Sequence, residues 1–335
     1  MLSGEDKSVV VLGAGSWGTA LALLLARNNH TALLWGNDPS FLSRLEKERQ
    51  NKTYLPDFSF PANLRIANSL DEAARSSSRF LLAVPSHAFR ASVTSLQPLI
   101  SDKSVLAWAT KGLEPGSGKL LSHVASEVLG NQRSLAVVSG PTFAREVALN
   151  LPSALTVASE REAVAEEVAS WIRNERVRVY TSKDVAGVQL GGAIKNVMAI
   201  AAGISDGLGF GSNARAALIT RGLAELTRLG VSMGGLKETF MGLTGAGDLI
   251  LTCTDDASRN RRVGLALGQG NKLPDILAVL GQEAEGVATA RELFQLARKL
   301  KVDMPITTQV YRVLYEKLSP QAAVEALLSR EPKQE

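Results

Sequence analysis

Three closely spaced glycines follow a short apolar run near the start of the chain. The segment Gly13-Ala-Gly15-Ser-Trp-Gly18 matches the pattern G-x-G-x-x-G and comes directly after Val9–Leu12. After a strand, the first glycine permits a tight turn, the second lets the backbone approach a pyrophosphate, and the third allows close packing of helix and strand. The backbone amides of Ser16 and Trp17, at the start of the next helix, would stabilise the negative charge. The segment therefore predicts dinucleotide binding, with a glycine turn that serves only packing as the alternative.

The end of the next apolar run bears on which sugar the dinucleotide carries. An acidic residue about twenty positions after the glycines binds a ribose 2′-hydroxyl, whereas an arginine accommodates a 2′-phosphate. Here the run Ala32–Trp35 is followed by Gly36-Asn37-Asp38. Asn37 can accommodate either sugar, and Asp38 can instead cap the helix that follows. NAD and NADP are therefore both candidate cofactors.

The twenty residues 185–204 are mostly apolar and carry a single charge, Lys195, at their centre. Their length would suffice for a membrane span. A lysine in mid-membrane costs about 2.5–3.5 kcal/mol on insertion scales, and the polar Gln189 and Asn196 weaken the case for a span further. We therefore expect a buried helix in a globular domain and no membrane insertion.

Burial would give Lys195 a chemical role. Hydride transfer between a nicotinamide and a carbinol needs a base for the hydroxyl proton in one direction and an acid in the other. A lysine becomes such a base when burial disfavours its charged form. Lys111, after the run Val105–Ala107, is a second candidate because it would lie at the carboxyl edge of a parallel sheet. The alternative for Lys195 is a side chain that extends along the helix to bring its amine into water.

Two later segments carry polar groups that could act with this lysine. Asp248 ends the glycine-rich stretch that begins at Gly242, and its carboxylate could orient the amine and offset its desolvation. The segment Ser258-Arg-Asn-Arg-Arg262 combines three arginines with hydroxyl and amide groups at the expected start of a helix. Arginine forms forked hydrogen bonds with phosphate oxygens, so the segment predicts a phosphate site, with a solvated basic helix face as the alternative.

The elements that must position these residues fall into two groups. The 335 residues correspond to about two domains at roughly 150 residues each. Up to about Tyr180, short apolar runs alternate with helical patterns such as Ser16–Asn28, and after Asp184 only helical periodicity continues. The sequence predicts an α/β protein with a Rossmann-type, parallel-sheet, dinucleotide-binding domain over residues 1–184 and an all-helical substrate and catalytic domain over residues 185–335. The expected strands are Val9–Leu12, Ala32–Trp35, Phe80–Val84, Val105–Ala107, Ala136–Ser139 and Leu155–Ala158.

Composition excludes several other classes of protein. Lysine and arginine number 37 against 33 acidic residues, without a long run of like charges, so no nucleic-acid partner is indicated. One cysteine and 3 scattered histidines predict neither a disulfide nor a metal site. The apolar run before Gly13 is too short for a signal peptide, so we expect a cytoplasmic protein.

Two further local motifs carry no functional prediction. Residues 112–119 lack the spacing of a P-loop, and the sequon Asn51-Lys-Thr53 carries no information without a secretion signal.

Together, the motifs resemble the bacterial NAD(P)-dependent glycerol-3-phosphate dehydrogenases over almost the whole chain. The resemblance implies interconversion of sn-glycerol 3-phosphate and dihydroxyacetone phosphate by hydride transfer with NAD or NADP, in support of phospholipid synthesis. The matching segments are residues 13–22, 84–87, 109–114, 139–144, 187–196, 217–222, 247–249, 252–254 and 258–262.

The resemblance also implies roles for individual residues. Lys195 would be the proton acceptor, with Asp248 and Lys111 as further catalytic residues. The residues implied to bind the cofactor are Gly13, Gly15, Ser16, Trp17, Gly18, Asn37, Lys111, Ala144, Arg259 and Glu285. Those implied to bind the phosphorylated substrate are Lys111, Gly140, Thr142, Lys195, Asp248, Ser258, Arg259 and Asn260.

Two alternative functions share part of this pattern. A related dehydrogenase acting on a small carboxylate would keep the nucleotide domain and the lysine but would not need the arginine cluster. A non-catalytic dinucleotide sensor would have no reason to combine Lys195, Asp248 and Arg259. No pattern in the sequence specifies an oligomeric state, and a homodimer is a candidate assembly only because it is the commonest among soluble oligomers.

Overall fold

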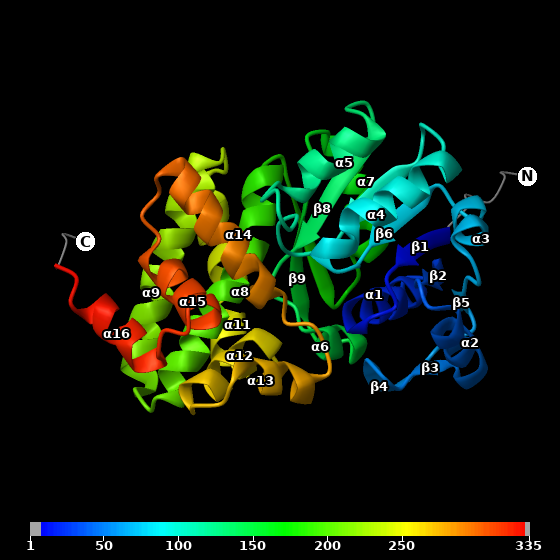
Figure 1. Cartoon of the computed structure of the whole chain (residues 1–335). Helices are drawn as coiled ribbons and strands as arrows, with labels where there is room; N and C mark the ends of the chain where they lie inside the picture. Colours follow the sequence, from blue (N-terminus) through cyan, green and yellow to red (C-terminus); the bar gives the residue numbers. More distant parts are fainter. Residues whose placement is uncertain (1–7, 332–335) are drawn as a thin grey trace, which may run out of the picture. The chain divides into compact units, whose positions relative to one another are not determined.

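The computed structural model describes residues 8–331, which form two compact units (Figure 1). The first contains the described residues up to Thr110 together with Leu121–Val185, and the second contains Lys111–Leu120 together with the described residues from Ala186 onward. A single boundary between residues 184 and 185, as expected from the sequence, therefore does not describe the whole division, because residues 111–120 also belong to the second unit. Leu113 and Leu120 are buried in the apolar core of the second unit, which explains why their segment is grouped with it.

The first unit is built on an eight-stranded sheet with the order β10-β9-β8-β7-β6-β1-β2-β5. The central strand β1 pairs in parallel with β2 on one side and β6 on the other, which is the strand order of a Rossmann fold. The predicted Rossmann-type sheet is thus confirmed for β2, β1, β6, β7 and β8, whereas β5, which pairs in parallel with β2, was not among the predicted strands. The strands are β1 (Ser8–Leu12), β2 (Thr31–Trp35), β5 (Leu64–Ile66), β6 (Arg79–Leu82), β7 (Val105–Trp108), β8 (Ser134–Ser139), β9 (Ser153–Ala158) and β10 (Val177–Ser182), with β3 (Gln50–Asn51) and β4 (Leu55–Ser59) in a separate hairpin.

One predicted strand runs in an unexpected direction. The sequence placed Leu155–Ala158 in the parallel sheet, but β9 is antiparallel to β8, and β10 is parallel to β9. The connection from β8 to β9 contains only the five-residue helix α6 (Ala144–Ala148). At about 1.5 Å per residue, so short a helix cannot carry the chain back along a strand of about 20 Å to start a parallel strand.

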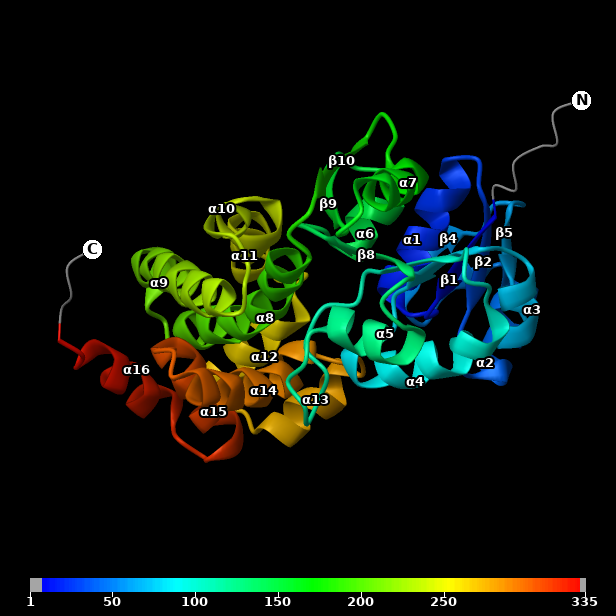
Figure 2. The same ribbon diagram turned by 90° about the horizontal axis from the view of Figure 1, so that it is seen from above.

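Helices cover both faces of this sheet, and alternate strand residues point to opposite faces. On β7, Ala107 belongs to the core that contains Leu21 and Leu24 of α1, whereas Trp108 packs edge-on against Phe89 of α4 with ring centroids 5.8 Å apart. Helix α1 contacts α6 and α7, and α4 lies beside α5 (Figure 2). The helices are α1 (Ser16–Arg27), α2 (Pro39–Glu48), α3 (Leu70–Arg75), α4 (Ser86–Leu96), the 3₁₀ turn η1 (Gln97–Leu99), α5 (Leu121–Leu129), α6 and α7 (Glu162–Ile172).

The second unit is helical, as predicted, and its centre is α8 (Val185–Gly207). Glycines let α12 approach α8 closely, because a Cβ at Gly203 or Gly264 would overlap a backbone carbonyl oxygen of the other helix. The other helices are α9 (Gly211–Ser232), α10 (Lys237–Met241), the π-helical turn η2 (Leu243–Gly247), α11 (Asp248–Thr254), α12 (Arg259–Gly268), α13 (Leu273–Leu280), α14 (Glu285–Leu300), α15 (Pro305–Tyr315) and α16 (Pro320–Leu328).

Helix α8 confirms the prediction of a buried apolar helix. Within residues 8–331, it is the helix whose length and hydropathy would suit a membrane span. Yet 89% of the 18-residue apolar stretch of this helix is buried inside the protein. Its residues from Gly187 to Ser205, including Lys195, are buried, so the helix acts as the core of the second unit.

Candidate active site

The glycine-rich loop connects β1 to α1, and its three glycines have different surroundings. Gly13 has φ +116°, and a Cβ there would lie 2.6 Å from the carbonyl oxygen of Ala83. A Cβ at Gly18 would overlap the carbonyl oxygen of Gly13. At Gly15, by contrast, a Cβ would meet no described atom within 4 Å. The first and third glycines are therefore needed for packing inside the protein, and the second faces open space.

The first turn of α1 provides donors for an anion beside that space. Gly15 is the N-cap of α1, no side chain of the described residues caps the helix, and its first turn contains no acidic residue. The loop also lies where the strand order of the sheet reverses, between β2 and β6, which is where parallel α/β sheets bind nucleotides. Backbone N–H groups at an uncapped helix start suit a pyrophosphate, so the loop fits a dinucleotide.

At the end of β2, the structure confirms that Asp38 caps a helix. One oxygen of its carboxylate accepts hydrogen bonds from the backbone N–H of Ser40 at 2.9 Å and of Phe41 at 3.1 Å, at the start of α2. The Ser40 hydroxyl donates to the same oxygen, and these hydrogen bonds lower the pKa of Asp38. Asn37, which precedes it, is exposed at the tip of the strand.

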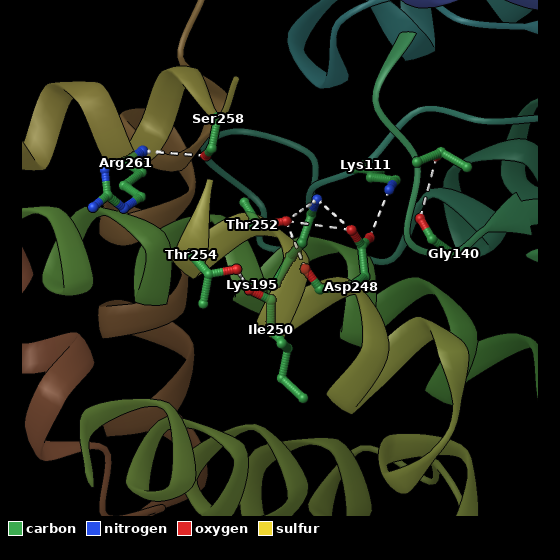
Figure 3. A network of polar contacts seen from close by, with 10 residues as sticks. Lys111, Gly140, Lys195, Asp248, Ile250, Thr252, Thr254, Ser258 and Arg261 are labelled. Atoms are coloured by element: carbon green, nitrogen blue, oxygen red, sulfur yellow. Dashed lines mark hydrogen bonds and ion pairs between the residues drawn. The ribbon is translucent and has the colours of Figure 1, made fainter. Parts of the chain in front are cut away.

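In the second unit, Lys195, Lys111 and Thr252 converge on the carboxylate of Asp248 (Figure 3). The Lys195 ammonium donates to one oxygen of Asp248 at 2.7 Å and to the Thr252 hydroxyl at 2.8 Å. Lys111 donates to the other oxygen at 2.6 Å. Asp248 is 0% exposed and Lys195 is 6% exposed. The structure thus brings together all three residues that the sequence assigned to catalysis.

Local structure explains how these groups meet. Lys195 extends from the middle of α8, and a Cβ at Gly191, one turn earlier, would overlap the carbonyl oxygen of Thr244. The turn η2 therefore lies close to α8, and α11 begins directly after it with Asp248. Thr252 is four residues later on the same face of α11. Thr252 is not among the site residues that the sequence predicts, although its spacing of four residues from Asp248 places both side chains on one face of a helix.

The surroundings of Lys195 change its protonation. Burial lowers the pKa of Lys195 to about 8, the positive charge of Lys111 lowers it as well, and the negative charge of Asp248 acts in the opposite direction. Lys195 can therefore lose and regain a proton near neutral pH, as a general base and acid must. The neighbouring Cys253 cannot, because burial raises the pKa of its thiol to about 12.

The residues of the arginine-rich segment 258–262 have different roles in the structure. Ser258 is the N-cap of α12, and its hydroxyl accepts from the backbone N–H of Arg261. Arg261 is buried and forms ion pairs with Asp206 and Asp256, so it serves structure. Arg259 is partly exposed at the first turn of α12, where its guanidinium donates to the side chain of Gln282 at 3.3 Å.

Two more predicted residues lie near the start of α12 and α14. The side-chain oxygen of Asn260 accepts from the backbone N–H of Gly286 at 2.9 Å, which ties the two helices together. The carboxyl of Glu285 has its pKa raised to about 7, first by burial and then by Glu283, while Arg259 and both lysines lower it. Glu285 therefore belongs to the same group of interacting charges as Lys195, although part of the residue reaches solvent.

The remaining predicted residues follow β8 in the first unit. Gly140 has φ +141°, and a Cβ there would lie 3.0 Å from the carbonyl oxygen of Ala154. The Thr142 hydroxyl donates to the carbonyl oxygen of Gly140 at 3.3 Å. Ala144 is the first residue of α6. All three follow the carboxyl end of β8, Gly140 and Thr142 in the turn and Ala144 at the start of the next helix, at the edge where parallel sheets bind ligands.

Comparison with known proteins identifies the family. Residues 8–165 match the model of the N-terminus of NAD-dependent glycerol-3-phosphate dehydrogenase, and residues 184–325 match that of its C-terminus. The glycerol-3-phosphate dehydrogenase [NAD(P)+] of Thioalkalivibrio sulfidiphilus is 58% identical over 327 residues, 98% of each chain. That of Aeromonas hydrophila is 52% identical over 99% of each chain.

A solved structure agrees with these relatives. The crystal structure of glycerol-3-phosphate dehydrogenase from Coxiella burnetii has a TM-score of 0.94 and 46% identity, and covers 96% of this chain and 99% of its own. The chain therefore belongs to the NAD-dependent glycerol-3-phosphate dehydrogenase family.

Proposed function

We propose that this NAD(P)-dependent glycerol-3-phosphate dehydrogenase uses Lys195 as the proton acceptor and donor of its reaction. The observation that carries the proposal is the buried ammonium of Lys195, held between Asp248 and Thr252 with a pKa lowered to about 8. In the oxidation of sn-glycerol 3-phosphate, the neutral amine of Lys195 accepts the proton of the C2 hydroxyl. In the reduction of dihydroxyacetone phosphate, its ammonium form returns a proton to the same oxygen. The nicotinamide, when bound, accepts or supplies the hydride at C2.

Asp248 and Thr252 position the amine for this transfer. The Thr252 hydroxyl donates to the backbone carbonyl of Asp248 at 2.6 Å, so its lone pairs are directed to the Lys195 ammonium. Asp248 is also shared with Lys111, which keeps the buried carboxylate neutralised when Lys195 is in its neutral form. This arrangement lets one buried lysine change its charge without leaving an unpaired carboxylate, a change that would otherwise be costly.

Substrate and cofactor contacts complete the proposal. Arg259 and Asn260 at the start of α12 bind the substrate phosphate, with Ser258, Lys111, Gly140 and Thr142 as further substrate contacts. Binding energy from this distant phosphate would align C2 with the nicotinamide. The glycine-rich loop with Ser16 and Trp17 binds the pyrophosphate. The other cofactor contacts proposed are Asn37, Lys111, Ala144, Arg259 and Glu285.

Absorbance at 340 nm tests the proposed reaction. With dihydroxyacetone phosphate as substrate, the enzyme should oxidise NADH, NADPH or both when each is supplied separately. With small 2-keto carboxylates as substrates, it should oxidise neither cofactor. Oxidation of either cofactor by a keto acid in preference to dihydroxyacetone phosphate would contradict the assignment.

We further propose that the protein acts in the cytoplasm as a homodimer that supplies phospholipid synthesis. Cyclic dimers are the commonest oligomers of soluble proteins. Light scattering coupled to size-exclusion chromatography should give twice the mass of one chain, and a single-chain mass would contradict the dimer.

The pH dependence of the two directions should be opposite around pH 8. Because the pKa of Lys195 is lowered to about 8, kcat/KM for glycerol 3-phosphate should rise about tenfold per pH unit below that value and level off above it. For dihydroxyacetone phosphate, kcat/KM should fall above that pH because the ammonium form is lost. Measurements should start near pH 7, above the second phosphate pKa of about 6, at saturating cofactor. Parallel profiles in the two directions would remove Lys195 from the proton transfer.

Because the space at Gly15 is open, a substitution there should weaken cofactor binding without preventing folding. The backbone of Gly15, with φ −76° and ψ −174°, suits any residue, so Gly15→Val should fold while its side chain enters the space that the pyrophosphate needs. Cofactor affinity should fall at least about tenfold, or about 1.4 kcal/mol, in a fluorescence titration.

Gly18→Val is the contrasting variant. Its Cβ would overlap the backbone of Gly13, so circular dichroism should show loss of stability. A folded Gly15→Val protein with unchanged cofactor affinity would mean that the loop serves only packing.

A further inference from the structure

Asn51 is a buried polar residue that the proposed reaction does not use. It ends β3 in the small hairpin with β4, which contacts α1, and it is 0% exposed. The sequence marked it as the first residue of a glycosylation sequon, but a side chain without exposed surface cannot accept a glycan in the folded protein. Since a buried amide group without partners would cost free energy, its contacts are informative.

The side chain of Asn51 links the glycine-rich loop to α1. Its amide nitrogen donates to the carbonyl oxygen of Ala14 at 3.0 Å and to the hydroxyl of Thr19 at 2.8 Å. Its carbonyl oxygen accepts from the backbone N–H of Tyr54 at 3.0 Å. Both amide hydrogens of Asn51 are therefore in hydrogen bonds. One bonds to Ala14, which lies between Gly13 and Gly15, and the other bonds to Thr19 near the start of α1.

The bond to Ala14 fixes the orientation of one peptide group in the loop. The described residues contain no cis peptide bond, so the carbonyl of Ala14 and the N–H of Gly15 lie in one plane and point in opposite directions. With the carbonyl directed to Asn51, the N–H of Gly15 points away from the hairpin. The free space that surrounds the Cβ position of Gly15 borders this peptide.

We infer that Asn51 is a positioning residue for the dinucleotide. It holds the peptide between Ala14 and Gly15 so that the loop is already in its binding conformation before the pyrophosphate arrives. Preorganisation of this kind raises affinity because less conformational freedom is lost on binding. The inference rests on the proposed function only in that a dinucleotide binds at this loop.

Asn63 provides a matched control in the same unit. Its amide nitrogen also donates two hydrogen bonds, to the carbonyl oxygens of Ala26 at 2.8 Å and His30 at 2.9 Å. These acceptors lie at the opposite end of α1 from the glycine-rich loop. Loss of the Asn63 side chain thus removes two similar hydrogen bonds, one to the last turn of α1 and one to the residue before β2, without touching the glycine-rich loop.

The experiment compares Asn51→Ser with Asn63→Ser in the full chain. Direct fluorescence titration with NADH and with NADPH should give a Kd raised about tenfold or more for Asn51→Ser and less than about twofold for Asn63→Ser. Both variants should lower Tm. At saturating cofactor and dihydroxyacetone phosphate, kcat of Asn51→Ser should stay within about threefold of wild type, because no residue near Lys195 changes.

Two outcomes would overturn the inference: an unchanged Kd in folded Asn51→Ser, or equal increases in Kd for the two variants. If Asn51→Ser does not fold, the affinity of Asn51→Asp tests the inference instead. Aspartate keeps the shape of asparagine and the oxygen that accepts from Tyr54, but it loses the amide group that donates to Ala14 and Thr19. Wild-type affinity in folded Asn51→Asp would then overturn it. A wild-type protein that binds NADH but does not reduce dihydroxyacetone phosphate would contradict the proposed function and not the role of Asn51.

Discussion

Replacing Lys195 by alanine is expected to lower kcat by at least about a hundredfold while cofactor affinity stays unchanged. A general acid–base group contributes about 10²–10⁴-fold to rate, and Lys195 is the buried amine whose pKa is lowered to about 8. The residue is far from the glycine-rich loop in sequence and belongs to the other unit. Steady-state absorbance at 340 nm would measure the loss, and titration with NADH would measure binding.

The alanine variant should still fold, which makes the result interpretable. Asp248 keeps its ion pair with Lys111 at 2.6 Å, so the buried carboxylate is not left without a cation. Lys195→Arg serves as a second variant, because arginine keeps the charge but does not release its proton near neutral pH. It should be as inactive as the alanine variant. If Lys195→Ala kept more than about a tenth of wild-type kcat at saturating substrate, the acid–base role would be wrong.

Replacing Arg259 by lysine is expected to lower kcat/KM for dihydroxyacetone phosphate by about ten- to a hundredfold. Lysine keeps the charge but loses the planar fork that binds two phosphate oxygens at once. A charge-assisted hydrogen bond is worth about 1.5–3 kcal/mol, which sets this range. Because Arg259 is also a proposed cofactor contact, the comparison should be made at saturating dinucleotide.

Arg262→Lys is the matched control for this prediction. Arg262 lies on the same helix three residues later but is exposed, so its replacement should change kcat/KM less than about twofold. Dihydroxyacetone, which lacks the phosphate, should be a poor substrate for every protein and should show little effect of Arg259→Lys. Equal proportional losses on both substrates would reassign Arg259 to the cofactor or to structure.

The features that were predicted correctly depend on residues close together in the chain. The glycine-rich loop, the strand before it and the helix after it form one continuous segment, so its glycines suffice to predict the turn from β1 to α1. The cap at Asp38 involves only the next three residues. Burial of Lys195 followed from the apolar composition of α8 itself. In each case the interaction that matters is local or is set by hydrophobic periodicity.

The short and exposed elements could not be predicted in this way. The strands β3, β4 and β5 have two, five and three residues, and β10 alternates buried valines with exposed polar residues at the sheet edge. The hydrophobic signal of β3 and β5 is too brief to separate them from loops, and that of β4 and β10 is interrupted by exposed residues. The direction of β9 depended on the length of α6, which the apolar run of the strand does not encode.

The sequence by itself determined the family, the two kinds of unit, the dinucleotide loop and the buried lysine. Only the tertiary structure separated residues of the same type by their partners. Arg259 and Arg261 are two positions apart, yet Arg261 is buried because Asp206, which is 55 residues away in the chain, pairs with it. Likewise, Asn51 acts on Ala14 across 37 residues, and Lys111 reaches Asp248 across 137. Such contacts come from the packing of helices and strands against one another, and no local pattern of residue types specifies which distant group each side chain will meet.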